Sequence, residues 1–195
     1  MNKLLTNERN ELTMLQMVCN IIIENYIELY RTICNNMRSN INSMEVLDMA
    51  TVYDVAKYIL DKYDAMSAMK LQKLLFYSQA MSLVWDDIPL FEDDFAWRKG
   101  PVCRRLYEAH KGKFMLDNSD FLDPYSPNTQ RLTKEQKDTI NAVVDSLIDL
   151  PAYRLSQMTH AEAPWKDARG SLPENVSCEN VIPKEAMQEY YAENW

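Results

Sequence analysis

The side chains best suited to proton transfer near neutral pH in this 195-residue chain are its two histidines. His160 stands two residues before Glu162, and a carboxylate beside an imidazole can orient it as a general base. A general base needs a nucleophile to activate, and the sequence has no Gly-x-Ser-x-Gly elbow and no recognisable Cys–His pairing. His110 lies on the buried stripe of an expected helix, which favours a structural histidine. We predict no catalytic residue, and a small hydrolase that uses His160 with Glu162 or a distant thiol stays as an alternative.

Metal and nucleotide chemistry finds little support in the same sequence. The four cysteines contain no C-x-x-C pair, so nothing indicates a zinc knuckle; they are Cys19, Cys34, Cys103 and Cys178. The chain has only three glycines, which excludes the clustered glycines of a Walker A loop or a dinucleotide-binding turn. We therefore predict no cofactor and no metal.

The overall charge and hydropathy narrow the class of partner. The formal net charge is −8, which makes nucleic acid an unlikely partner because a phosphate-backbone binder is normally basic. The most apolar stretch, 17–29, is interrupted by polar residues and is far shorter than the roughly 20 residues that span a bilayer. The N-terminus lacks the pattern of a cleavable leader. We expect a cytoplasmic protein with reduced thiols and no membrane contact.

Charge is distributed unevenly along the chain. An acidic block at 86–94 precedes a basic stretch at 98–113, in which Glu108 is the one opposing carboxylate. The stretch is either a solvated face that pairs with the acidic block or a docking patch for an acidic partner. Exposed aromatic side chains beside arginine would serve as interface anchors. The candidates for partner binding here are Tyr77, Trp97, Arg98, Lys99, Arg104, Arg105 and Tyr107.

Residues 1–44 differ in composition from the rest. Apolar residues recur every three or four positions, which predicts one long helix over about 8–37, followed by a polar linker. This helix either packs on its own domain or mediates self-association or partner contact. We treat 1–44 as an N-terminal helical extension with its linker, and 45–195 as the main domain.

Capping signals and apolar stripes predict a mainly helical main domain. Thr51 with Asp54 and Thr133 with Gln136 form capping-box patterns, and Ser67 is a further helix cap. Pro101 is expected to open a helix that runs to Lys111, and residues 113–131 read as a loop. The full prediction is a single domain of six to eight helices with at most one small β element near residues 90–100, plus the N-terminal helix. Besides the helix at 101–111, helices are expected near 52–63, 67–85, 134–148, 151–160, 164–170 and 183–191.

Several segments in this order resemble a known family. The most specific are Lys-Leu-Gln-Lys-Leu-Leu at 70–75, Trp-x-x-Gly-Pro-Val at 97–102 and Thr-His-x-Glu-x-Pro-Trp at 159–165. They resemble the SocA-like antitoxin domain, also called the Panacea domain, which occurs among phage-associated GepA-like proteins. The similarity covers about residues 50–192. Further matches lie at 55–60, 89–91, 106–107 and 132–136.

The resemblance implies a mainly helical antitoxin that neutralises a cognate toxin, encoded beside it, by direct protein–protein binding. A link to protease-mediated toxin turnover is known in the family, so an adaptor or counter-defence protein that acts on a host protease or defence factor is the alternative. Lys73 joins the partner-binding candidates because it matches the signature of the second helix. The remaining motif residues are expected to be structural; they are Gly100, Pro101, Thr159, His160, Glu162 and Trp165. The chain departs from the family at 103–105, where Cys-Arg-Arg replaces a more apolar stretch, and in its first 44 residues.

Overall fold

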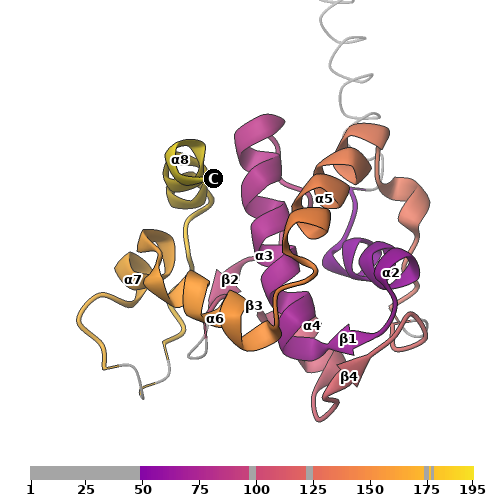
Figure 1. Ribbon diagram of the computed structural model, residues 1–195, viewed down its shortest axis with the longest axis horizontal. Helices are drawn as coiled ribbons and strands as arrows, with labels where there is room; N and C mark the ends of the chain where they lie inside the picture. The colour runs from indigo at the N-terminus through magenta and orange to yellow at the C-terminus, as the bar shows by residue number, and fades with distance from the viewer. Residues whose placement is uncertain (1–48, 97–99, 122–124, 174–175, 177) are drawn as a thin grey trace, which may run out of the picture. The chain divides into compact units, whose positions relative to one another are not determined.

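The computed structural model describes residues 49–96, 100–121, 125–173, 176 and 178–195. These residues form seven α-helices, a 3-10 turn and four two-residue strands (Figure 1). The predicted helix at 8–37 lies outside the described residues. The helices are α2 (Val52–Tyr63), α3 (Ala68–Trp85), α4 (Arg104–His110), α5 (Lys134–Leu147), α6 (Ala152–Ala161), α7 (Ala163–Arg169) and α8 (Lys184–Asn194). The strands are β1 (Met66–Ser67), β2 (Phe95–Ala96), β3 (Val102–Cys103) and β4 (Met115–Leu116), and the 3-10 turn η1 is Thr129–Arg131.

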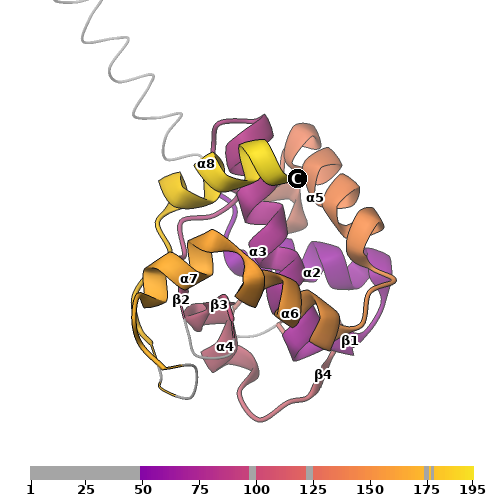
Figure 2. The ribbon, with the colours of Figure 1, turned by 60° about the vertical axis from the view of Figure 1, so that its left-hand side comes forward.

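Helix α3 is the central element of this unit. Every residue from Leu71 to Leu83 is buried, because α2, α5, α6 and α8 all pack against the helix (Figures 1 and 2). A helix covered on all sides has no solvated stripe, so its polar side chains must find partners in the interior. Those buried polar side chains are Gln72, Lys73, Ser78, Gln79 and Ser82.

The helix starts follow their local capping signals. Thr51 and Asp54 form a reciprocal capping box at the start of α2, and Thr133 and Gln136 form one at the start of α5. The Ser67 hydroxyl accepts a hydrogen bond from the Lys70 amide at the start of α3. All three caps agree with the sequence because each satisfies helix N–H groups within four residues.

The predicted mainly α fold is confirmed, but the β structure is more extensive than expected. Strand β2 lies in the predicted region near 90–100 and pairs antiparallel with β3, which lies where a helix was predicted. Strand β1 pairs antiparallel with β4, which lies in the segment predicted as a loop. Helix α4 begins at Arg104 rather than at Pro101, because Val102 and Cys103 pair with β2. No helix among the described residues is both long enough and apolar enough to cross a membrane.

Candidate functional site

Residues from all three specific motifs meet beside α3. Lys73 is only 1% exposed, and its Nζ donates a hydrogen bond to the Pro101 carbonyl at 2.8 Å. Burial lowers the pKa of the Lys73 amine from 10.5 to about 7, because removing an ammonium ion from water disfavours its charged form. We call Lys73, Gly100, Pro101, His160 and Trp165 the motif cluster.

Gly100 lets the chain pass close to this amine. Its φ of +83° lies in the left-handed region, where a side chain is strained. A Cβ atom at this position would stand 2.7 Å from Lys73 Nζ and 2.9 Å from His160 Nε2. Both the backbone conformation and the available space therefore require glycine.

His160 and Glu162 do not form the oriented pair that a general base needs. The His160 ring stacks on Trp165, with ring centroids 4.2 Å apart and planes 1° from parallel. The Glu162 carboxylate instead accepts hydrogen bonds from the Tyr77 hydroxyl at 3.0 Å and the Tyr191 hydroxyl at 2.6 Å. Burial raises the pKa of Glu162 above its usual value. This carboxylate thus connects α3, the α6–α7 junction and α8.

The described thiols are poorly suited to nucleophilic chemistry. Cys103 and Cys178 are both buried, and burial raises the pKa of Cys103 to about 11, so this thiol is protonated near neutral pH. Among the described residues, no three His, Cys, Asp or Glu side chains lie close enough together to hold a metal ion. Thr159, from the third motif, is also buried, and its hydroxyl donates to the Ser156 carbonyl at 3.0 Å.

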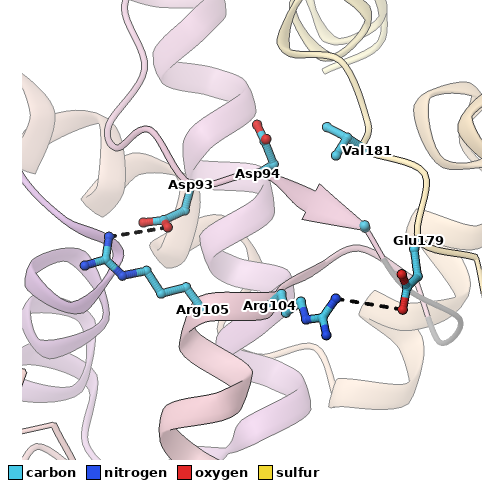
Figure 3. Close-up of a pocket in the computed structure, with 7 residues that line it drawn as sticks. Asp93, Asp94, Arg104, Arg105, Glu179 and Val181 are labelled. Carbon is cyan, nitrogen blue, oxygen red and sulfur yellow. Dashed lines mark ion pairs between the residues drawn. The ribbon is translucent and has the colours of Figure 1, made fainter.

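The exposed charged side chains beside β2 and β3 line a cleft (Figure 3). The cleft has a volume of about 450 Å³. Strand β2 and the residues before it supply one wall, the first turn of α4 supplies another, and the segment before α8 supplies the third. We call it the arginine cleft; its lining residues are Asp93, Asp94, Ala96, Arg104, Arg105, Glu179 and Val181.

The two arginines extend in opposite directions within the cleft. Arg105 points to Asp93, with 3.5 Å between Nη1 and Oδ1, and Arg104 points to Glu179, with 3.8 Å between Nη1 and Oε1 (Figure 3). Their side chains are 57% and 63% exposed, so each ion pair contributes less than about 1 kcal/mol to stability. Tyr53 contacts Arg105 in two ways: its hydroxyl donates a hydrogen bond to the Arg105 carbonyl at 3.2 Å, and its ring faces the Arg105 guanidinium.

The structure separates the predicted partner-binding residues into three groups. Lys73 and Tyr77 are each 1% exposed and lie in the interior, where they brace the backbone and Glu162. Arg104 and Arg105 are exposed in the cleft, whereas Tyr107 is half-buried and lines a smaller pocket with His110. Trp97, Arg98 and Lys99 lie outside the described residues.

Two residues of the arginine cleft have no counterpart in the sequence-based predictions. Glu179 and Val181 approach from more than seventy residues further along the chain, and neither belongs to a periodic pattern or a motif. Asp93 and Asp94 belong to the acidic block. The Arg105–Asp93 contact is a pair of the kind expected under one of the two alternatives for the basic stretch, that of a solvated face.

The chain matches one family model. Residues 71–166 match the family described as "Antitoxin SocA-like, Panacea domain". No curated protein and no solved structure shows significant similarity to the chain. The matched residues run from α3 through α7, so they include the motif cluster, both arginines and Glu162. Residues 71–166 therefore carry a domain similar to that of the SocA-like antitoxin family.

Proposed function

We propose that the protein is the antitoxin of a toxin–antitoxin pair and neutralises a cognate protein toxin by direct binding at the arginine cleft. The observation that carries this proposal is the pair of exposed arginines, Arg104 and Arg105, in an open cleft of a SocA-like domain. Arginine is enriched at the energetic centres of protein interfaces because its planar fork binds carboxylates in two-point contacts.

The ion pairs in the cleft are weak enough for a toxin carboxylate to replace the protein's own carboxylates at the arginines. The two arginine–carboxylate distances of 3.5 and 3.8 Å are longer than a close charge-assisted hydrogen bond. Releasing Arg104 from Glu179 therefore costs little, and a toxin carboxylate can take its place. Val181 is 47% exposed and offers apolar area beside these charges. The expected toxin surface carries carboxylates next to an apolar side chain.

The family description favours a role without catalysis, and the buried motif cluster fits such a role. The Cys103 thiol is protonated near neutral pH, and two tyrosines donate hydrogen bonds to Glu162, so neither side chain is a favourable nucleophile or base. We propose no cofactor. A cytoplasmic location, where the cognate toxin would act, is part of the proposal.

A growth assay tests the proposal. Each open reading frame that flanks the gene is expressed alone and then with this protein. We expect one neighbour to arrest growth and co-expression of the wild-type protein to restore it. The double variant Arg104→Glu with Arg105→Glu should fail to restore growth, because it reverses the charge of the cleft.

The control is Lys134→Glu, which reverses an exposed charge on α5, a helix that lines no part of the cleft. This control should restore growth as well as the wild type does. The antitoxin role is contradicted if no neighbour is toxic, and the cleft is contradicted if both variants rescue equally. Measuring the toxin's lifetime in the rescued cells separates plain binding from delivery to a protease, which would shorten that lifetime.

A further inference from the structure

Two buried glutamines on α3 hold two of the three walls of the arginine cleft. Gln72 and Gln79 stand seven residues apart, so they lie two turns apart on the same side of the helix. Both side chains are at most 2% exposed. A buried amide costs free energy unless all of its hydrogen bonds are made, so the partners of these two side chains indicate what they hold.

Gln72 binds the backbone that leads into the arginines. Its Oε1 accepts from the Cys103 amide at 2.9 Å, and its Nε2 donates to the Cys103 carbonyl at 3.3 Å. The side chain thus pairs with both backbone groups of one residue, as a neighbouring strand would. Arg104 follows Cys103 directly, so the position of Cys103 sets the start of α4 and the origin of both arginine side chains.

Gln79 makes the equivalent contact on the opposite wall. Its Oε1 accepts from the Leu90 amide at 2.9 Å, and its Nε2 donates to the Phe91 carbonyl at 2.9 Å. Asp93 and Asp94 follow two and three residues later and line the cleft. The pairing of Phe95 with Cys103 then joins the two walls.

We infer that Gln72 and Gln79 are positioning residues for partner binding: they set the spacing between the arginine wall and the aspartate wall without touching the partner. The inference rests on the proposed function, because it makes the affinity of the cleft for the toxin depend on these two amides. It also explains why an apolar central helix carries glutamine at two sites where leucine would cost less to bury.

The first test needs no partner. Hydrogen exchange is measured by NMR on the full chain for the wild type, Gln72→Met and Gln79→Met. Methionine keeps the length and removes every hydrogen bond of the amide, including the contact of Gln72 Nε2 with His110 Nε2 at 3.3 Å and the bond from the Phe91 amide to Gln79 at 3.4 Å. We expect the Cys103 amide to exchange at least about tenfold faster in Gln72→Met, and the Leu90 amide to do so in Gln79→Met, while α5 amides keep their protection. Unchanged exchange at Cys103 and Leu90 would show that the two glutamines do not hold these segments, and it overturns the inference.

The second test is a double-mutant cycle with the toxin identified by the growth assay. Gln72→Met should weaken toxin binding by roughly tenfold in the wild-type background. The loss should be less than about threefold when Arg104→Ala is already present, because Gln72 acts through the position of Arg104. An equal loss in both backgrounds overturns the positioning role. If Arg104→Ala alone leaves affinity unchanged, the proposed use of the cleft fails, and the exchange measurement still decides whether the glutamines hold its walls.

Two controls separate positioning from general loss of stability. Ser78→Ala lies between the glutamines on α3 and removes a buried hydroxyl that has no hydrogen-bond partner among the described residues. Ile140→Ala leaves a cavity on α5, which lines no part of the cleft. Both should keep wild-type affinity under conditions where they remain folded. A loss of affinity in Ile140→Ala as large as that in Gln72→Met contradicts a specific positioning role.

Discussion

At the scale of single residues, Gly100 and Gly112 form a natural comparison. Both have positive φ, +83° and +88°, but only Gly100 has neighbours where a Cβ would stand. We predict that Gly112→Ala costs about 1 kcal/mol of unfolding free energy from backbone strain alone. Gly100→Ala should cost about 2 kcal/mol more, because Lys73 or His160 must also move. Urea unfolding measures both, and equal losses would show that the motif cluster adapts without cost.

The buried amine of Lys73 leads to a prediction about how the unfolding free energy depends on pH. Burial lowers its pKa to about 7 in the folded protein, whereas the unfolded amine titrates near 10.5. Between these two values the unfolded chain binds more protons than the folded one, so stability rises with pH in this window. The rise due to Lys73 should be on the order of 3 kcal/mol between about pH 7 and 9.5.

The comparison is with Lys73→Met, which keeps most of the side-chain volume and removes the titrating group. Its unfolding free energy should lack this rise, and urea unfolding at several pH values in the window measures the difference. The window stops below pH 10 because burial raises the pKa of Tyr77 and Tyr191, so these tyrosines oppose the trend at higher pH. Parallel curves for the two proteins would contradict a buried, titrating Lys73.

At the scale of elements, Glu162 connects helices that are distant in sequence. Tyr191 on α8 donates to Glu162 at 2.6 Å, while its neighbour Tyr190 has a half-buried ring on the same helix. Tyr191→Phe should lower the unfolding free energy by about 1–3 kcal/mol, because a hydrogen bond to a partly buried carboxylate is lost. Tyr190→Phe should change it by less than about 0.5 kcal/mol. Similar effects in thermal or urea unfolding would show that the carboxylate does not anchor α8.

The elements also show how far local sequence signals reach. The capping boxes of α2 and α5 were predictable because each is complete within four residues. The β1–β4 pair was not, because a two-residue strand has no periodicity and its pairing depends on contacts between residues about fifty positions apart. The start of α4 was predicted too early for the same reason. Gln72 and β2 hold Cys103 in an extended conformation, and these long-range contacts cannot be predicted from a proline at position 101.

At the scale of the whole molecule, the described core begins at Ala50 and includes residues as late as Tyr191. We predict that residues 45–195 fold without the first 44 residues, since a chain of about 150 residues buries enough surface to be stable. Circular dichroism during urea unfolding should show one cooperative transition for this shortened chain, and loss of the transition would contradict the boundary. Sedimentation of the full-length and the shortened protein tests self-association through residues 8–37. If these residues mediate it, the shortened protein should form a smaller assembly.

The candidate site was only partly predictable at this scale. Arg104 and Arg105 were identified by their charge, but the residue types of Lys73 and Tyr77 do not by themselves show that these side chains are buried. The absence of a polar face on α3, where Gln72 and Gln79 stand among leucines and aromatics, is the signal that indicates burial. Glu179 and Val181 reach the cleft only through the tertiary fold.

The most direct test of toxin neutralisation through the arginine cleft is the affinity of the purified protein for the toxin that arrests growth. Isothermal titration calorimetry compares the wild type with Arg104→Glu plus Arg105→Glu, and with Lys134→Glu as the control. We predict a loss of at least about tenfold, or about 1.4 kcal/mol, for the cleft variant, and wild-type affinity for the control. All three should unfold at similar urea concentrations. Equal affinity of the wild type and the cleft variant would contradict toxin binding at the cleft.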